Sequence, residues 1–576
     1  MPTALNTAWR IQKTEAVAER GMVTSMHPLA SAAGVEMLRA GGNAVDAAVA
    51  TAFAIGVVEP FMSGLGGVAA MVYHQRATGK TMVVDGSSTA PSEARADMFE
   101  LAPATEQAGM YGWRATLNDA ANTGYRAPIT PGTPACLLEC LARYGSGRLS
   151  RSQVLAPAIR LADEGFGVDG YMASTTAFAM RRLRAFPETM RTYFQEDGTP
   201  YTPATMTKQP DVLRQPDLAR TLRALADHGA DAYYMGETAE RIVRHVRANG
   251  GVLNLGDFRD YRVRVHDAPL AASYRGHTLH GLPELSGCIT AYQALGMLER
   301  FDLAAMGAGS ADATHVIAEA LRRAFVDRFA HLADPRFTQV PFAGLLSAEY
   351  AGERAATIDT QHARRDVAAG DPWRFQAGSG GRALAAAGAG GEGCTTHLTV
   401  VDAERNVASL TSTLGELFGS GVVAEGTGVC LNNGMTWFDP EPGRINSIAP
   451  GKRILWAPTP TVVLRDGQPV LGIGAPGGRR IMSAIVQSIV NVLDFKLGIQ
   501  DAVTAPRVHC EGPTTLADTR LAPETRATLR ERGHALQEIP DDASAFSFAR
   551  PNGILIQRNE LRGGVNQHTP AAGIGY

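Results

Sequence analysis

The sequence predicts an α+β fold, and three observations along the chain support this. Up to about residue 376, most segments carry apolar residues at the spacing of amphipathic helices. A segment dominated by Gly, Ala and Ser then runs from Gln376 to Cys394. After it, the pattern changes to short runs of β-branched and apolar residues bounded by turns. We therefore expect a mainly helical part, a flexible connection and a mainly β part.

The first part is expected to open with two short Ala-rich helices between Gly34 and Val58, separated at Gly41 and Gly42. The tract EPFMSGLGG follows as a turn and leads into a strand, AAMVYH. Helical spacing returns over roughly residues 130–250, as in LARTLRALADHGADAYY. A further helix is expected from about Ala311 to Ala333.

The second part is expected to contain the strands THLTVVD, VASLTST, GVCLNN and TPTVVLRDGQPVLGIG, followed by the helix RRIMSAIVQSIVNVLD. The first two strands form a hairpin if their polar turn is centred on Glu404. In that register Leu398 faces Leu410, and Thr395 faces Thr413 on the same side of the sheet. This register predicts that the hydroxyl groups of the two threonines lie within hydrogen-bonding reach.

Composition and charge exclude several classes of function. The 576 residues are 45% hydrophobic and 19% charged, as in a folded globular protein, and the net charge of −3 gives no basic excess for binding nucleic acid. We find no secretory signal and no run of about 18 apolar residues, so we expect a cytoplasmic protein without a membrane span. The six cysteines are scattered and the common nucleotide and zinc motifs are missing, so no disulfide framework, metal or cofactor is expected.

Thr395 stands directly after the flexible segment and opens a strand. A threonine hydroxyl is a weak nucleophile, but a free α-amine with a pKa of about 7.7–8.0 can act as the base for its own side chain. This chemistry requires the bond between Cys394 and Thr395 to be cut. A flexible segment upstream lets the freed end move away. The alternative is that Thr395 is only a β-branched residue at the start of a strand.

Several motifs together resemble the γ-glutamyltransferase family. They are CTTHLTVVDAERNVASLTSTL, FGSGV, GTGVCLNN, the tract PGKR…PTPTVV…GAPGG, and the amino-terminal GMVTSMHPLASAAGVEMLRAGGNAVDAAVATAFAIGVVEPFMSGLGG. The resemblance runs from about Gly21 to Tyr576 and implies an N-terminal-nucleophile hydrolase with an αββα four-layer sandwich formed by two subunits from one precursor. It implies self-cleavage into a large subunit, residues 1–394 with the flexible tail 376–394, and a small subunit, residues 395–576.

The same resemblance implies catalytic roles. Thr395 is the nucleophile of both self-cleavage and catalysis, and Thr413 hydrogen-bonds to it. Gly477 and Gly478 follow a strand and open a helix, where backbone N–H groups can stabilise an anion, and the family uses this pair as its oxyanion hole. The acyl-enzyme would be an ester on Thr395 that water or an amine releases.

The positions that bind glutamate in typical family members differ in this chain. An arginine is replaced by Ser87, an asparagine by Gly415, an acidic residue by Trp437, and a pair of serines by Trp456 and Ala457. The α-carboxylate and the α-ammonium of a glutamyl group both need charged or strongly polar partners. These replacements therefore predict a more apolar pocket for the acyl group.

We therefore expect a self-cleaving amidohydrolase or acyltransferase that acts on a small-molecule amide whose acyl group is not a standard γ-glutamyl group. Its partners would be its own two subunits. Whether two such heterodimers associate into a dimer is left open. One rival is a genuine γ-glutamyltransferase or glutathione hydrolase in which Arg95, Arg453 or Arg479 replaces the missing arginine. Another rival is an uncleaved, non-catalytic binding protein. It also stays open whether Trp437 and Trp456 only pack in the core.

Overall fold

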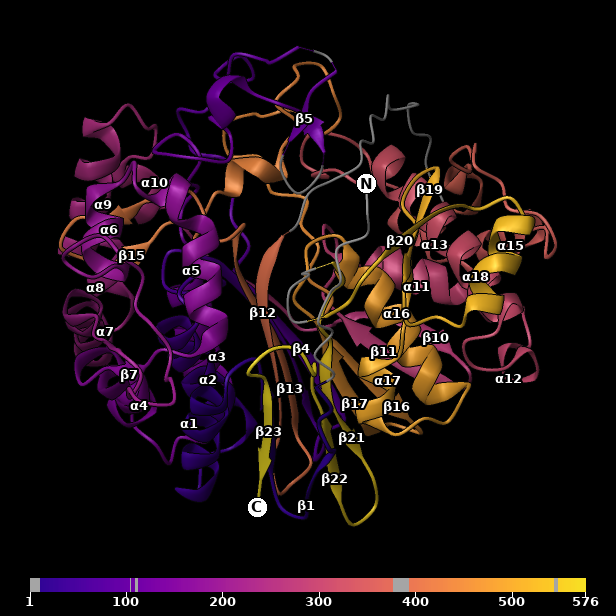
Figure 1. The fold of residues 1–576 in the computed structure, drawn as a ribbon, viewed down its shortest axis with the longest axis horizontal. Helices are drawn as coiled ribbons and strands as arrows, with labels where there is room; N and C mark the ends of the chain where they lie inside the picture. Colours follow the sequence, from indigo (N-terminus) through magenta and orange to yellow (C-terminus); the bar gives the residue numbers. More distant parts are fainter. Residues whose placement is uncertain (1–10, 104, 109–111, 377–392, 543–546) are drawn as a thin grey trace.

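The computed structural model describes residues 11–103, 105–108, 112–376, 393–542 and 547–576. The segment that the sequence predicts to be flexible, Gln376 to Cys394, lies outside these ranges from residue 377 to 392. Two antiparallel sheets of seven strands each form the centre of the molecule, and helices cover their outer faces (Figure 1). This helix–sheet–sheet–helix order is the four-layer sandwich that the family resemblance implies.

The first sheet carries the predicted hairpin in its centre. Its strands, in order across the sheet, are β23 (Ala572–Gly575), β2 (Met22–Ser25), β12 (Cys394–Val401), β13 (Val407–Gly415), β3 (Val68–Gln75), β4 (Lys80–Asp85) and β9 (Arg264–His266). Every residue of β12 and β13 is buried. Both strands read as nearly continuous runs of Val, Leu, Ser and Thr, as expected for strands covered on both faces.

The second sheet lies face to face with the first. Its strands, in order, are β1 (Ala16–Ala18), β22 (Leu561–Gly564), β21 (Asn552–Ile556), β17 (Gln468–Gly474), β16 (Thr461–Arg465), β11 (His277–Gly281) and β10 (Leu270–Tyr274). Buried hydrogen bonds join the two sheets. Ser409 donates its hydroxyl to the Ile473 carbonyl at 3.1 Å, and Asn552 donates its side-chain N–H to the His397 carbonyl at 2.9 Å.

Helices from the first half of the chain cover the first sheet. They are α1 (Pro28–Arg39), α2 (Ala44–Val58), α3 (Thr133–Tyr144), α4 (Arg151–Asp163), α5 (Gly170–Leu183), α6 (Pro187–Tyr193), α7 (Pro216–His228), α8 (Ala230–Tyr234), α9 (Glu237–Ala248) and α10 (Leu255–Arg259). Every residue of α2 is buried, and this helix contacts both β12 and β13. Its start is fixed by a capping box, in which Asn43 and Asp46 satisfy each other's backbone N–H groups.

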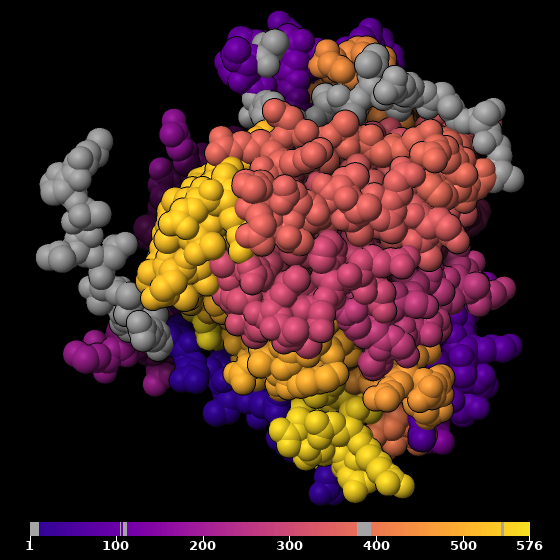
Figure 2. All heavy atoms as spheres, turned by 90° about the vertical axis from the view of Figure 1, so that its right-hand side faces the viewer, coloured from indigo at the N-terminus to yellow at the C-terminus, as the bar shows by residue number. Residues whose placement is uncertain are grey.

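The second sheet is covered by helices from both parts of the chain. They are α11 (Gly287–Leu298), α12 (Leu303–Met306), α13 (Ala311–His331), α14 (Phe342–Leu345), α15 (Ala348–Ala356), α16 (Arg480–Leu493), α17 (Ile499–Thr504) and α18 (Pro523–Glu531). Figure 2 shows this side of the molecule, where α11 to α15 and the C-terminal segment with α18 share one surface, and α13 contacts α18 directly. Among the described residues, no helix combines the length and apolarity needed to cross a membrane.

Shorter elements complete the described chain. They are β5 (Gln107–Ala108), β6 (Trp113–Arg114), β7 (Phe166–Gly167), β8 (Val212–Leu213), β14 (Val423–Ala424), β15 (Val429–Cys430), β18 (Val508–His509), β19 (Thr514–Asp518), β20 (Ala535–Ile539) and the 3₁₀ turns η1 (Leu117–Asp119), η2 (Pro372–Phe375) and η3 (Gly434–Trp437). These elements lie outside the two large sheets.

The structure confirms most of the expected elements and corrects the division into a helical and a β part. The two Ala-rich helices, the strand after them, the helix that starts at Ala311 and the helix after the Gly-rich turn are all present. However, the first part also supplies β2, β3, β4 and β9 to one sheet and β1, β10 and β11 to the other. Several of these strands are short, and their side chains are buried by elements distant in sequence, so local periodicity did not reveal their number.

Candidate active site

Thr395 is the second residue of β12, in the centre of the first sheet, and is only 3% exposed. The expected register holds further along the hairpin, where Leu398 lies opposite Leu410. Near Thr395 the register shifts at a β-bulge, and Cys394 lies opposite Gly415. The direct pairing expected for Thr395 is therefore replaced by an irregularity of the kind that re-aims side chains beside active sites.

The Thr413 hydroxyl connects Thr395 to the peptide bond before it. It accepts a hydrogen bond from the Thr395 hydroxyl at 3.1 Å and one from the Gly415 N–H at 2.9 Å. It donates its own proton to the Cys394 carbonyl oxygen. One donor and two acceptor positions are all that a hydroxyl group has, so its orientation is fully determined. The Thr395 hydroxyl oxygen and the carbonyl oxygen of the Cys394–Thr395 bond are thus held by one group.

His397, two residues beyond Thr395, does not serve as a base for it. One imidazole nitrogen of His397 lies 2.9 Å from the Thr411 hydroxyl and the other 3.1 Å from the Thr399 hydroxyl. Burial lowers the pKa of His397 to about 3, so the ring is neutral over the physiological range. We conclude that His397 ties the two strands of the hairpin together.

The turn after α2 forms one wall of the site. The Phe61 and Met62 carbonyls accept backbone hydrogen bonds from Phe418 at 2.9 Å and Leu414 at 3.1 Å, so the turn is attached to the end of β13 and to the chain just after it. Glu59 ends α2 and is 1% exposed, and its carboxyl group accepts a hydrogen bond from the Thr396 hydroxyl at 3.2 Å.

Burial raises the pKa of Glu59 to about 8, against smaller opposing effects of the Thr396 hydrogen bond and the Arg550 charge. Glu59 therefore carries a proton at neutral pH. Its other carboxyl oxygen has no hydrogen-bond partner among the described residues. A protonated, half-satisfied carboxyl group beside the residue that follows Thr395 was not anticipated from the sequence, where Glu59 only reads as the first residue of a turn.

The Gly-rich loop between β17 and α16 forms another part of the wall. Gly477 and Gly478 have φ values of +135° and +58°, which are left-handed conformations that favour glycine. A Cβ atom on Gly477 would lie 2.5 Å from the Cα of Ala549, so no side chain fits there. α16 starts at Arg480, so the positive end of its helix dipole also lies beside this loop.

A small cavity joins these parts. Its described lining consists of Met62, Gly393, Cys394, Thr395, Leu417, Pro476, Gly477, Arg480, Phe548 and Arg550. The sequence predicts Cys394, Thr395 and Gly477 at one site, and the structure brings these three together. Arg480 and Arg550 were not predicted. Arg480 had a signal, since it directly follows the Gly-rich loop, whereas nothing in the sequence around Arg550 connects it to Thr395.

None of the positions expected to bind the acyl group is in the described lining of the cavity. Gly415 follows Thr413 by two residues and has a φ of +104°, and a Cβ atom there would lie 2.1 Å from the Asn433 side-chain oxygen and 3.7 Å from the Trp437 ring. Trp437 is 1% exposed. The place where an asparagine side chain is expected in the family is therefore already filled by Asn433 and Trp437.

Ser87, Trp456 and Ala457 are also buried. The Ser87 hydroxyl accepts a hydrogen bond from Arg264, whose guanidinium also pairs with Asp85 at 2.9 Å. The Trp456 carbonyl accepts a hydrogen bond from Arg328 at 2.7 Å, and its ring packs in the apolar core around the second sheet. The cation that contacts Ser87 is thus Arg264, which lies far from it along the sequence.

The three arginines proposed as replacements have carboxylate partners elsewhere. Arg95 pairs with Asp97 at 2.9 Å on the surface. Arg453 pairs with Glu284 at 2.5 Å and Asp334 at 3.4 Å. Arg479 pairs with Glu511 at 2.9 Å and stacks on the Phe329 ring. None of them is in the described lining of the cavity at Thr395.

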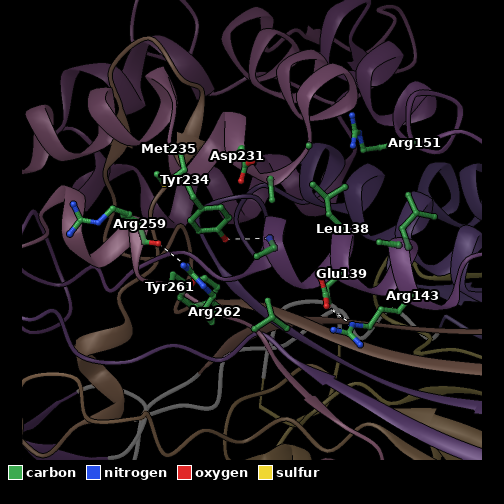
Figure 3. Close-up of a pocket in the computed structure, with 16 residues that line it drawn as sticks. Leu138, Glu139, Arg143, Arg151, Asp231, Tyr234, Met235, Arg259, Tyr261 and Arg262 are labelled. Atoms are coloured by element: carbon green, nitrogen blue, oxygen red, sulfur yellow. Dashed lines mark hydrogen bonds and ion pairs between the residues drawn. The ribbon is translucent and has the colours of Figure 1, made fainter.

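A wider groove lies on the outer helices, away from Thr395 (Figure 3). Its rim carries several arginines, but Figure 3 shows Arg151 and Arg259 at opposite ends and Arg143 paired with Glu139. Tyr261, in its wall, donates a hydrogen bond to the Gly86 carbonyl at 2.9 Å. Because the charged groups of this groove do not converge, we do not interpret it as a second reaction site. Tyr261 in its wall instead helps to hold the chain beside Ser87 in place.

Comparison with known proteins identifies relatives that match nearly the whole chain. The chain matches the family described as Gamma-glutamyltranspeptidase over residues 30–576. It is 38% identical over 549 residues to the acylase ACY 1 proenzyme of Pseudomonas sp. (strain V22), covering 94% of this chain and 92% of that protein. It is 34% identical over 561 residues to the glutathione hydrolase proenzyme of Bacillus subtilis (strain 168), covering 96% and 92%. The crystal structure of cephalosporin acylase from Bacillus halodurans is similar with a TM-score of 0.85 and 27% identity, covering 100% of this chain and 99% of the other.

The buried Glu59 predicts a pH dependence of stability. The folded protein keeps a proton on Glu59 between the ordinary pKa of 4.5 and the raised value of about 8, whereas the unfolded chain releases it. Stability from this group is therefore lost as pH rises through that interval. We expect the melting temperature of the wild type to fall relative to that of Glu59→Gln as pH rises over the interval. Parallel curves would contradict the raised pKa, and the exposed Glu349→Gln is the matched control.

The crowding at Gly415 predicts a cost for any side chain there. Gly415→Ala should combine the backbone strain of a positive φ, about 1–2 kcal/mol, with a clash against Asn433. Gly451→Ala is the matched control, because Gly451 has a φ of +67° but a Cβ atom there would have open space around it. Denaturant unfolding should therefore show a clearly larger loss for Gly415→Ala than for Gly451→Ala. Equal losses would show that no clash exists.

Proposed function

Because the chain belongs to the gamma-glutamyltranspeptidase family, we propose that Thr395 is the nucleophile of this amidohydrolase or acyltransferase and that the precursor cuts its own chain before Thr395. The observation that carries this proposal is the bridge made by the Thr413 hydroxyl between the Thr395 hydroxyl and the Cys394 carbonyl oxygen. A threonine with only a structural role in a strand would not need hydrogen bonds that link its hydroxyl to the carbonyl of the peptide bond before it.

Self-cleavage follows from that bridge. The Thr395 hydroxyl oxygen attacks the Cys394 carbonyl carbon, and the Thr413 hydroxyl donates to the oxygen on which negative charge develops. The carbon–nitrogen bond then breaks, and the proton lost by the Thr395 hydroxyl ends on the new α-amine. The product is an ester between Cys394 and the Thr395 side chain. Water hydrolyses this ester, which leaves a carboxylate on Cys394 and a free amino terminus at Thr395.

The mature enzyme would repeat the same chemistry on a substrate. The new α-amine, with an ordinary pKa of about 7.7–8.0, accepts the proton of the Thr395 hydroxyl as it attacks the amide carbonyl. Gly477 lines the cavity, and the N–H groups of Gly477 and Gly478 at the start of α16 are suited to stabilise the oxyanion. The amine half leaves, and water or an acceptor amine releases the acyl group from Thr395.

The sheet order supports two subunits that stay together after the cut. Cleavage would give residues 1–394 and 395–576, and β12 and β13 from the second piece lie between β2 and β3 from the first. Separating the pieces would break hydrogen bonds along both of these pairings and expose the buried hairpin. We therefore propose a heterodimer in which both subunits build the active site.

The acyl group is proposed to differ from a standard γ-glutamyl group. The family position of an asparagine is Gly415, whose surroundings leave no room for a side chain, and the buried Trp437 lies where an acidic residue is expected. The glutathione hydrolase relative keeps the rival open that γ-glutamyl amides are the substrates. Turnover of γ-glutamyl-p-nitroanilide at a rate above that of other acyl-p-nitroanilides would decide for this rival.

Self-cleavage predicts a simple result on a denaturing gel. The wild type should give two bands, and Thr395→Ala should give one full-length band. Thr413→Val should slow the cut by about 100-fold or more, the size typical for removing one donor to a developing oxyanion. Thr413→Ser should restore most of the rate, and the exposed Thr519→Ala should cleave like the wild type. Normal cleavage in Thr413→Val would overturn the role given to the bridge.

A further inference from the structure

The cavity that holds Thr395 contains two guanidinium groups with no role in the chemistry described above. Arg480 is the first residue of α16, and Arg550 lies just before β21. Both line the cavity together with Thr395 and Gly477. A neutral amide bond does not need two positive charges beside it. Arginine is, however, the side chain that best recognises a carboxylate.

Arg550 is held in a fixed orientation. Its backbone N–H donates to the Pro476 carbonyl at 2.9 Å, which attaches it to the Gly-rich loop. Its guanidinium donates to the Tyr171 hydroxyl and lies 5.5 Å from the centre of the Tyr171 ring. Tyr171 in turn packs edge-on against Phe61, with ring centres 5.3 Å apart. A guanidinium positioned by an aromatic ring loses little further freedom when it binds an anion.

Arg480 belongs to the same small unit. Its guanidinium donates to the Ser547 carbonyl, so it is connected to the segment that carries Arg550. Ala549, in that segment, is the residue against which Gly477 packs. The Gly-rich loop, Arg480 and Arg550 are therefore positioned together. The dipole of α16 adds a further positive field at the place where Arg480 begins the helix.

The nearby Glu59 does not cancel the charge of Arg550. Glu59 acts on Arg550 through space, but burial raises the pKa of Glu59 to about 8, so it is mostly uncharged at neutral pH. Asp169 is paired with His27 at 3.3 Å. The described lining of the cavity contains no carboxyl side chain. A substrate ammonium group would therefore meet two like charges and no counter-charge in that lining, whereas a carboxylate would meet two guanidinium groups.

We propose that Arg480 and Arg550 form a carboxylate-binding subsite beside Thr395, and that the preferred amide carries a carboxylate but no ammonium group near its scissile bond. Met62, Leu417 and Phe548 in the same lining would contact its methylene groups. The inference rests on the proposed function, because it takes Thr395 as the nucleophile. It moves the carboxylate site away from the position of Ser87, where the family arginine is missing.

The test compares matched amides on the processed wild-type enzyme. Glutaryl-p-nitroanilide carries a carboxylate in the acyl half, N-butyryl-4-aminobenzoate carries one in the amine half, and butyryl-p-nitroanilide and butyranilide carry none. γ-Glutamyl-p-nitroanilide adds an ammonium group. We expect one of the carboxylate amides to exceed its neutral counterpart by about 10-fold or more in kcat/KM, and γ-glutamyl-p-nitroanilide to be poorer than glutaryl-p-nitroanilide. Which amide gains identifies the half of the substrate that the subsite binds.

Substitution of the arginines should remove this selectivity. Arg480→Gln and Arg550→Gln should each lower the ratio of kcat/KM for the favoured carboxylate amide over its neutral counterpart by about 10- to 100-fold. Arg550→Lys should retain part of the ratio, because it keeps the charge but not the planar fork. Arg95→Gln, on the surface, should keep the wild-type ratio. Glutarate or 4-aminobenzoate should inhibit the wild type more strongly than Arg550→Gln.

Three outcomes would overturn the inference. The wild type could prefer neutral or γ-glutamyl amides, the arginine variants could keep the wild-type ratio, or both anions could inhibit Arg550→Gln as strongly as the wild type. Failure of the proposed function looks different, because the wild type would then remain one full-length band or cleave none of these amides. If an Arg→Gln variant does not process itself, the ratio in Arg550→Lys decides.

Discussion

The site depends on one hydroxyl group. Thr413 accepts from Thr395 and donates to the carbonyl of the bond before Thr395, and this requires strands β12 and β13 to keep a fixed spacing. They do so because both lie in the middle of a seven-stranded sheet, between β2 and β3, with every residue buried. A bulge at the end of the hairpin then provides the one local irregularity that the site needs. A rigid sheet with one bulge can hold neighbouring atoms in the fixed geometry that a reaction between them requires.

The same arrangement of strands explains how the chain could be cut before Thr395 and the two pieces still remain one folded unit. The strands before and after the proposed cut belong to shared sheets, and side-chain hydrogen bonds such as that from Ser409 to the Ile473 carbonyl join these sheets to each other. The cut creates a chain end inside this framework rather than at a loop on the surface. It exchanges one peptide bond for an amine and a carboxylate at the cavity that Thr395, the Gly-rich loop and the two arginines line together.

The sequence predicted the parts of the site that depend on local pattern. A polar turn centred on Glu404 predicted the hairpin register from Leu398 onward, and the Gly-rich tract before a helix pointed to Gly477, which lines the same cavity as Thr395. It could not predict the bulge at Thr395, because a bulge reflects contacts with neighbouring strands. Glu59 and Arg550 were missed for a similar reason: each reaches the site only through packing between segments that are distant along the chain.

The apolar acyl pocket that the sequence predicts also depends on contacts between distant segments, which the sequence does not reveal. Trp437 and Trp456 replace polar family residues, so their chemistry suggested an apolar pocket, but both are 1% exposed and pack in the core. Substitution patterns identify which contacts a chain has lost. Which contacts replace them depends on three-dimensional packing, and here the cations in the cavity at Thr395 are Arg480 and Arg550 rather than Arg95, Arg453 or Arg479.

The most direct test of the central claim is to locate the acyl group on the enzyme. The purified protein is mixed briefly with an amide substrate, quenched in acid to keep the new amine protonated, and digested for tandem mass spectrometry. We predict a peptide that begins at Thr395 and carries the acyl group on the side chain of that residue. An acyl group on another residue, or full activity of a chain that is not cut before Thr395, would contradict the account.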